Sequence, residues 1–117
     1  MSEIDPHGKN PHEPGAKLDQ GKLYASLVLG DFARALEEVC KIGTFGANKY
    51  TKSGWLSVPD AQARYSDAMM RHWLAMMAGE ERCPDSGELH MSHFAWNALA
   101  VLELKRREKD GYDVPGM

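Results

Sequence analysis

Apolar residues recur every three or four positions in three separate segments, and this spacing restricts the fold more than any other feature of the sequence. In the first segment, about residues 26–45, the repeat is carried by Leu29, Phe32, Leu36 and Val39. Residues three and four apart share one face of an α-helix, whereas a half-buried strand would alternate strictly. The sequence contains no alternation of useful length, so we predict an all-α fold.

Residues that start or stop helices set the expected limits of the three segments. The first helix is expected to end at Gly43 and the glycines after it, in the polar stretch GTFGANKYTKSGW. The second is expected from Pro59 and Asp60 to about Ala78, because proline is tolerated in a first turn and an acidic residue is stabilised there by the helix dipole. The third is expected over about residues 88–107.

The chain has 117 residues, 43% of them hydrophobic, which is enough for one small core. Residues 1–16 are rich in proline and glycine and poor in large apolar residues, so they are expected to form a flexible arm. Residues 17–107 are predicted to be a single helical domain. Residues 108–117 lose the periodicity and are predicted to be a loose tail.

Three helices of this length make a thin bundle, and apolar side chains surround the second helix almost completely. These are Met69, Met70, Trp73, Leu74, Met76 and Met77. A helix that is apolar all round is either central or covered by another subunit, so we predict a bundle completed by homo-oligomerisation. A monomer with an adaptable, Met-rich ligand groove is the alternative.

Composition excludes several classes of function. The formal net charge of −3 does not favour a nucleic-acid polymer as partner. Cys40 and Cys83 form neither a CxxC nor a CxxxC pattern, which argues against a disulfide scaffold and a zinc knuckle. No apolar run is long enough for a membrane span, and the N-terminus lacks a signal-peptide core. We expect a cytoplasmic protein with a small-molecule partner.

The stretch DSGELHMSHFAWN places His90, His93 and Asn97 on one face of the third helix. Imidazoles bind transition metals and act as acids or bases near neutral pH, and an amide can orient a phosphate, a base or water. For either histidine alone, a hydrogen-bonded core residue is the simpler interpretation. Three such residues on one face of a helix indicate a binding or catalytic site.

The second helix contains the motif YSDAMMRHW. Asp67 and Arg71 are spaced four apart, and His72 follows. An exposed ion pair is the ordinary interpretation. The apolar neighbours of Arg71 favour a half-buried guanidinium group, which would bind an anion such as a phosphate.

Two lysine-containing segments flank the first helix. KLDQGK precedes it and ANKYTKSGW follows it; their polar and aromatic residues are Lys17, Asp19, Lys22, Lys49, Tyr50, Lys52 and Trp55. Ammonium groups hold phosphates, and aromatic rings stack on bases. Each segment alone is equally typical of a solvated loop.

Adjacent acidic residues occur at Glu37 and Glu38 and again at Glu80 and Glu81. Carboxylates on facing helices can hold magnesium, which bridges phosphate oxygens and activates water. A solvated helix face is the alternative for each pair.

The motifs KLDQGK, GANKY, RYSDAMMRH, DSGELHMSH and NAL, in that order and spacing, resemble the phage-associated family of dATP/dGTP diphosphohydrolase domains over about residues 17–104. The resemblance implies an oligomer in the cytoplasm of a bacterial host, related in fold to the all-α NTP pyrophosphohydrolases. Such enzymes cleave a nucleoside triphosphate to monophosphate and pyrophosphate with Mg²⁺ or Mn²⁺. The matching positions are Lys17, Asp19, Lys22, Lys49, Tyr50, Trp55, Arg64, Asp67, Arg71, His72, Asp85, His90, His93 and Asn97.

We therefore expect a purine deoxynucleoside triphosphate as substrate. The catalytic candidates are Asp67, His72, His90 and His93. The nucleotide-binding candidates are Lys17, Asp19, Lys22, Lys49, Tyr50, Trp55, Arg64, Arg71 and Asn97. The metal-binding candidates are Glu37, Glu38, Asp67 and Asp85.

The sequence departs from the wider pyrophosphohydrolase pattern in its metal motif. Those enzymes carry ExxE on one helix, whereas here Glu38 is followed three residues later by Lys41. One alternative is therefore a non-catalytic protein that sequesters a nucleotide or cyclic nucleotide signal, for example to counter host defence. Another is a subunit of a larger assembly with no ligand of its own.

Overall fold

The computed structural model describes residues 3–111. In this range the helices are α1 (Ser26–Leu29), α2 (Ala33–Lys49), the 3-10 helix η1 (Gly54–Ser57), α3 (Ala61–Met77) and α4 (His90–Lys109). The only strand-like pairing among these residues is an isolated antiparallel bridge between Arg82 and Leu89. The prediction of an all-α fold is confirmed.

The chain divides into two compact units, the first ending at Phe32 and the second beginning at Ala33. The first unit has little regular structure, and Asp5 organises its loop. The carboxylate of Asp5 is 4% exposed and accepts hydrogen bonds from the backbone N–H groups of His7, at 2.6 Å, and Lys17, at 2.8 Å. These bonds lower the pKa of Asp5, so the loop is closed by an ionised side chain.

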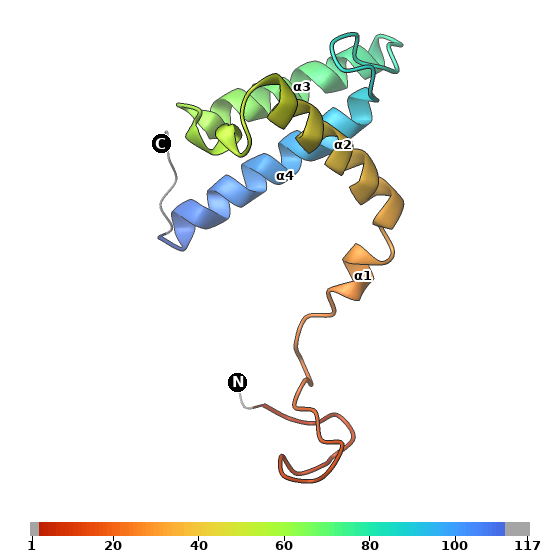
Figure 1. Ribbon diagram of the computed structural model, residues 1–117, viewed down its shortest axis with the longest axis vertical. Helices are drawn as coiled ribbons and strands as arrows, with labels where there is room; N and C mark the ends of the chain where they lie inside the picture. The colour runs from red at the N-terminus through yellow and green to blue at the C-terminus, as the bar shows by residue number, and fades with distance from the viewer. Residues whose placement is uncertain (1–2, 112–117) are drawn as a thin grey trace. The chain divides into compact units, whose positions relative to one another are not determined.

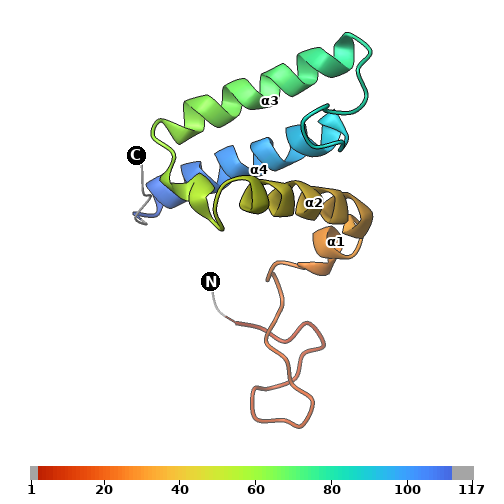
Figure 2. The ribbon, with the colours of Figure 1, turned by 45° about the horizontal axis from the view of Figure 1, so that its top comes forward.

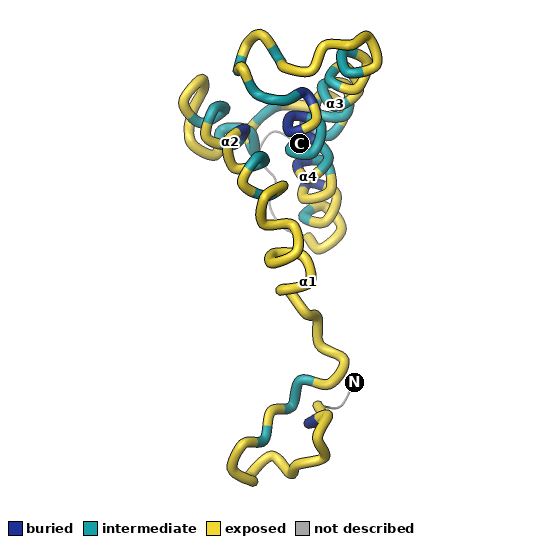
Figure 3. Tube along the Cα trace, turned by 90° about the vertical axis from the view of Figure 1, so that its right-hand side faces the viewer, coloured by how far each residue is buried: buried dark blue, intermediate teal, exposed yellow. Residues whose placement is uncertain are grey.

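Helix α4 is the centre of the second unit. It packs against both α3 and α2, and it runs back alongside α3 after the connection at residues 78–89 (Figures 1 and 2). Buried positions concentrate on α4 (Figure 3). Its buried residues are His90, Ser92, His93, Asn97, Ala100 and Leu104. The buried face is therefore polar near the start of the helix and apolar toward its end.

The structure differs from prediction in the first helical segment. Residues 30–32 separate α1 from α2, at a glycine that lowers helix propensity and beside a helix that buries none of its residues. The predicted end, at about residue 45 within the glycine-containing stretch, is too early, because α2 continues through Gly43 and Gly46 to Lys49. A Cβ at Gly43 would make only an ordinary contact, 3.6 Å from Nε1 of Trp96. Helix α2 packs against α4, and this packing outweighs the low helix propensity of the glycines.

The two later helices lie close to their predicted limits. Helix α3 begins immediately after Pro59 and Asp60 and ends at Met77. It leaves Met70, Trp73, Leu74 and Met77 from 40% to 65% exposed. Homo-oligomerisation through such a face stays a prediction. None of the described helices is both long and apolar enough to cross a membrane.

Candidate functional site

A cavity of about 730 Å³ lies in the second unit, between the C-terminal half of α2, residues 50–58, and the facing sides of α3 and α4. Small-molecule sites in proteins have volumes of roughly 300–1,000 Å³. Because α2 continues through Gly43 and Gly46, residues between 42 and 49 form one part of this wall. The cavity can hold a ligand the size of a nucleotide.

The charge of the cavity wall is opposite to that of the whole chain. Lys49, Lys52, Arg64 and Arg71 line it, and none of its described lining residues is acidic. The chain as a whole has a net charge of −3. A concave site with four cationic side chains concentrates anions, so the expected ligand is strongly anionic.

An aromatic group forms another part of the wall. Trp55, Tyr65 and Trp96 pack edge to face, with ring centroids 5.5–6.1 Å apart. The Tyr65 hydroxyl donates a hydrogen bond to the carbonyl oxygen of Trp55 at 3.2 Å, and burial raises the pKa of Tyr65. The group therefore offers a fixed, uncharged surface for a flat ring.

Lys49 is held at the edge of the cavity by several neighbours. Its Nζ donates to Oδ2 of Asp85 at 2.6 Å, and it lies 5.7 Å and 5.3 Å from the ring centres of Phe45 and Tyr50. The hydrogen bond to Asp85 raises the pKa of Lys49. Arg71 was expected to be half-buried but is exposed. Its side chain makes no hydrogen bond or ion pair within residues 3–111, so its guanidinium donors are available to an anion.

Three histidines from α3 and α4 form a cluster beside the cavity. The rings of His72 and His93 stack 4.4 Å apart with an interplanar angle of 8°. Burial, with smaller effects of His93 and His90, lowers the pKa of His72 to about 4. Burial also lowers the pKa of His93. Both rings are therefore neutral at pH 7, and of the three histidines only His93 lines the cavity.

Hydrogen bonds fix the rings of this cluster. Nδ1 of His72 lies 2.8 Å from Nδ1 of His90, and Nε2 of His90 lies 2.6 Å from Oε1 of Glu80. Nε2 of His93 lies 2.6 Å from the hydroxyl oxygen of Ser86. Beside this cluster, Asn97 donates to the carbonyl oxygen of His93 at 2.8 Å. Each buried polar side chain of α4 thus has at least one hydrogen-bond partner.

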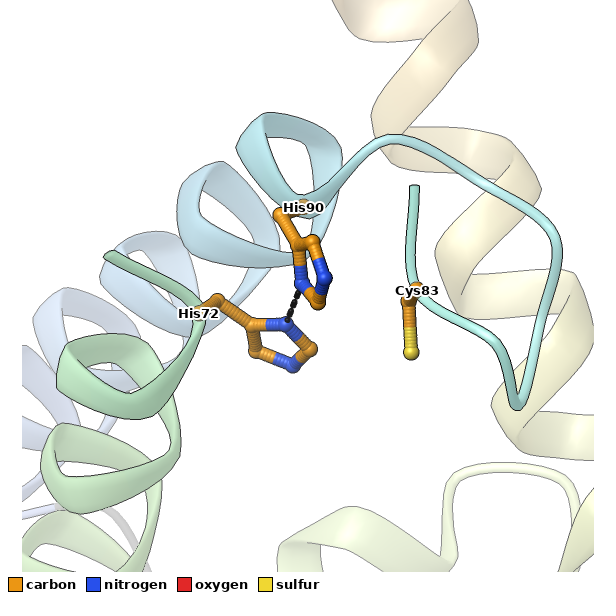
Figure 4. Close-up of side chains that lie close together, drawn as sticks. All are labelled: His72, Cys83 and His90. Atoms are coloured by element: carbon orange, nitrogen blue, oxygen red, sulfur yellow. Dashed lines mark hydrogen bonds between the residues drawn. The ribbon is translucent and has the colours of Figure 1, made fainter. Parts of the chain in front are cut away.

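Cys83 joins His72 and His90 as a potential metal ligand. One nitrogen of each ring and the sulfur of Cys83 lie within 4.8 Å of one another. Figure 4 shows the three side chains close together. Cys83 was not predicted as a ligand, because only paired cysteines indicate a metal site in a sequence. Tyr65 and Ser86 were not predicted either, and Glu80 was expected only as a possible magnesium ligand. Their partners are set by the packing of α3, α4 and the connection between them.

The carboxylates expected to bind magnesium are not brought together. Glu38 pairs with Lys41 at 2.8 Å and accepts a hydrogen bond from Ser92 at 3.3 Å. Asp85 pairs with Lys49, and Glu37 and Asp67 are exposed. Across residues 3–111, no three of these side chains have ligand atoms within 4.8 Å of one another. Because Mg²⁺ prefers several oxygen ligands, these residues do not fit a magnesium site.

The structure brings many of the remaining candidates to the cavity. Its lining includes Lys49, Tyr50, Trp55, Arg64, Arg71, His93 and Asn97. Asp67, His72 and His90 are not among the described lining residues. Lys17, Asp19 and Lys22 belong to the first unit.

Comparison with known proteins links the sequence to nucleotide chemistry. A family described as "dATP/dGTP diphosphohydrolase, N-terminal" matches residues 12–113. A protein of Salmonella phage PMBT28 named "dATP/dGTP diphosphohydrolase" is 30% identical over 90 residues, which are 77% of this chain and 29% of that protein. The chain therefore spans less than a third of the length of this relative. No solved structure matches the chain.

Proposed function

The chain belongs to the dATP/dGTP diphosphohydrolase N-terminal family, and on that premise we propose that its cavity binds a purine deoxynucleoside triphosphate for cleavage to the monophosphate and pyrophosphate. The observation that supports this best is the cavity wall, which combines four cationic side chains with an aromatic group and has no acidic residue among its described lining. Cationic side chains bind phosphates, and a flat aromatic side chain can stack on a purine ring.

Each part of the nucleotide has matching residues in this proposal. Lys49 and Arg71 neutralise the phosphates, with Arg64 and Lys52 contributing to the positive field. Trp55 offers its ring to the base, with Tyr50 at the exposed side of the cavity. Asn97 holds the backbone at His93 through its hydrogen bond.

His93 is the residue best suited to activate water. It is neutral at pH 7 because burial lowers its pKa, and it lines the cavity. In the proposed reaction the water oxygen attacks the α-phosphorus while His93 takes a proton from that water. The bond to the bridging oxygen breaks, and pyrophosphate leaves with its electron pair and is stabilised by the cations. No step here involves magnesium bound by the carboxylates.

Product analysis tests this function. The purified chain is incubated separately with dATP, dGTP, dCTP and TTP in the presence of Mg²⁺ or Mn²⁺, and the products are separated by ion-exchange chromatography. We expect the monophosphate and pyrophosphate from dATP and dGTP, and at least tenfold less product with His93→Gln. Release of inorganic phosphate as the first product, or equal rates for His93→Gln, would contradict the proposed chemistry.

A second candidate function is sequestration without cleavage, and the separation of the acidic candidates favours it. Here the cavity would bind the nucleotide through the same cations and aromatic residues. Mass spectrometry of ligand released by heating the protein distinguishes the two functions. An intact nucleotide after long incubation supports sequestration, whereas the monophosphate supports hydrolysis.

Asp85→Asn is expected to strengthen nucleotide binding by about two- to fivefold. The substitution releases Lys49 from its 2.6 Å ion pair and removes a negative charge close to the cavity, although exposed pairs of this kind are worth only about 0.2–1 kcal/mol. Titration calorimetry with dGTP measures the change. Asp110→Asn, which breaks the comparable pair with Arg106, should leave the affinity unchanged. Weaker binding by Asp85→Asn would instead give Asp85 a direct role.

A further inference from the structure

We propose that His72, Cys83 and His90 form a binding site for a divalent transition-metal ion of the zinc class. The three residues come from α3, from the connection at residues 78–89 and from the first position of α4. They lie beside the nucleotide cavity and are not among its described lining residues. The proposed metal ligands are therefore distinct from the residues that line the cavity, although His72 stacks on His93 of its wall.

The spacing of the ligand atoms suits a tetrahedral ion. The three atoms lie within 4.8 Å of one another, and Figure 4 shows all three side chains gathered in one small region. A zinc ion at about 2.0–2.3 Å from each ligand requires nitrogen and sulfur atoms roughly 3.3–3.6 Å apart. Side-chain rotation is enough to reach this geometry.

The contact between the imidazoles of His72 and His90 indicates where a metal ion would bind. Nδ1 of His72 and Nδ1 of His90 are 2.8 Å apart, and two ring nitrogens approach this closely only when a proton lies between them. Because Nε2 of His90 donates to Glu80, the shared proton is carried by Nδ1 of His72. When that proton moves to Nε2 of His72, a metal ion can take its place and bind the Nδ1 lone pairs of both rings. The thiol of Cys83 releases its proton to solvent, because the thiolate is the form that binds metal.

Glu80 orients one of the proposed ligands. Its Oε1 lies 2.6 Å from Nε2 of His90, so that the opposite nitrogen, Nδ1, is the one facing His72. Histidines that bind metals commonly donate their second N–H to a carboxylate, which fixes the ring and increases its basicity. His90 is 4% exposed, so its orientation is set by these contacts and not by solvent.

Backbone hydrogen bonds hold Cys83 in position. The N–H of Cys83 donates to the carbonyl of Glu88 at 2.8 Å, and the N–H of Gly87 donates to the carbonyl of Cys83 at 2.8 Å. Gly87 has a φ of +75°, which glycine adopts without strain. The turn therefore carries the sulfur back toward the start of α4.

The donor set determines which ions fit. Two imidazole nitrogens and a thiolate favour Zn²⁺ and related transition metals over Mg²⁺. Three protein ligands leave one coordination position open for water or another ligand. The ion would tie α3, the connection and α4 together, and through the stacking of His72 on His93 it would brace the wall of the cavity.

Titration of the metal-free chain with Co²⁺, a spectroscopic substitute for zinc, tests the site directly. We expect one ion per chain, visible bands typical of tetrahedral Co²⁺ and a thiolate charge-transfer band in the near ultraviolet. Zn²⁺ should displace the Co²⁺ and remove the bands. Cys83→Ser should lose the charge-transfer band, whereas Cys40→Ser, at an exposed free cysteine, should keep it. No nucleotide is present, so the result is separate from that of the hydrolysis assay.

His72→Gln provides the second variant. It should weaken metal binding at least tenfold, whereas His12→Gln, at an exposed residue of the first unit, should not. Circular dichroism without metal checks that each variant keeps its helices, and where Cys83→Ser unfolds, His72→Gln decides the outcome. An unchanged charge-transfer band in Cys83→Ser, unchanged affinity in His72→Gln, or no metal bound by the parent chain would overturn the proposal.

Discussion

Leu104→Ala is expected to lower the free energy of unfolding by about 2–5 kcal/mol. Leu104 has no exposed surface and is the largest fully buried side chain among the described residues. The other buried apolar residues are Ile42, Ala61 and Ala100, so the core is small and the neighbours of Leu104 offer little volume to fill a cavity. Denaturant unfolding followed by circular dichroism measures the loss.

Leu102→Ala is the matched control for this prediction. Leu102 lies on the same helix but is 58% exposed, and surface substitutions usually change stability by less than about 0.5 kcal/mol. The two variants remove the same atoms and have similar helix propensity effects. A similar loss of stability in both would contradict the packing of α4 described above.

Arg71→Ala is expected to weaken binding of dATP or dGTP by about 10- to 100-fold. Hydrogen bonds to charged groups contribute about 1.5–3 kcal/mol, and Arg71 lines the cavity without an ion pair in the described part of the chain. The substitution should therefore remove the proposed phosphate contact without leaving a partner charge unpaired. Titration calorimetry with a non-hydrolysable triphosphate analogue measures the affinity.

Two further measurements separate this contact from a general loss of positive charge. Arg106→Ala removes an arginine that pairs with Asp110 near the end of α4, and it should leave the affinity nearly unchanged. Binding by the parent chain should also weaken with rising salt, because phosphate contacts are electrostatic. Equal effects of the two arginine substitutions would exclude a specific phosphate contact at Arg71.

The predictions from sequence were most accurate where they depended on contacts within a single helix. The spacing of His90, His93 and Asn97 predicted a single face of a helix, and the structure buries all three on α4. The limits of α3 also lie close to those predicted, although Pro59 and Asp60 precede the helix and the Asp60 side chain makes no capping hydrogen bond. In both cases the relevant contacts lie within one helix or at its end, so the sequence contains the needed information.

The features that were not predicted from the sequence depend on contacts between different helices and loops. Gly43 and Gly46 were expected to end a helix, but α2 continues through both of them to Lys49 and packs against α4. Cys83 becomes a candidate metal ligand only because the packing of α3 against α4 places His72 and His90 beside it. The carboxylates at Glu38 and Asp85 were assigned to metal, yet each pairs with a nearby lysine. The residue type alone does not show whether a carboxylate will pair with a lysine or bind a metal ion.

A crystal structure of the chain with a non-hydrolysable purine deoxynucleoside triphosphate analogue is the most direct test of the nucleotide cavity. We expect the phosphates within hydrogen-bonding distance of Lys49 or Arg71 and the purine against Trp55. A nucleotide bound away from these residues, or no bound nucleotide at saturating concentration, would contradict the assignment of the cavity.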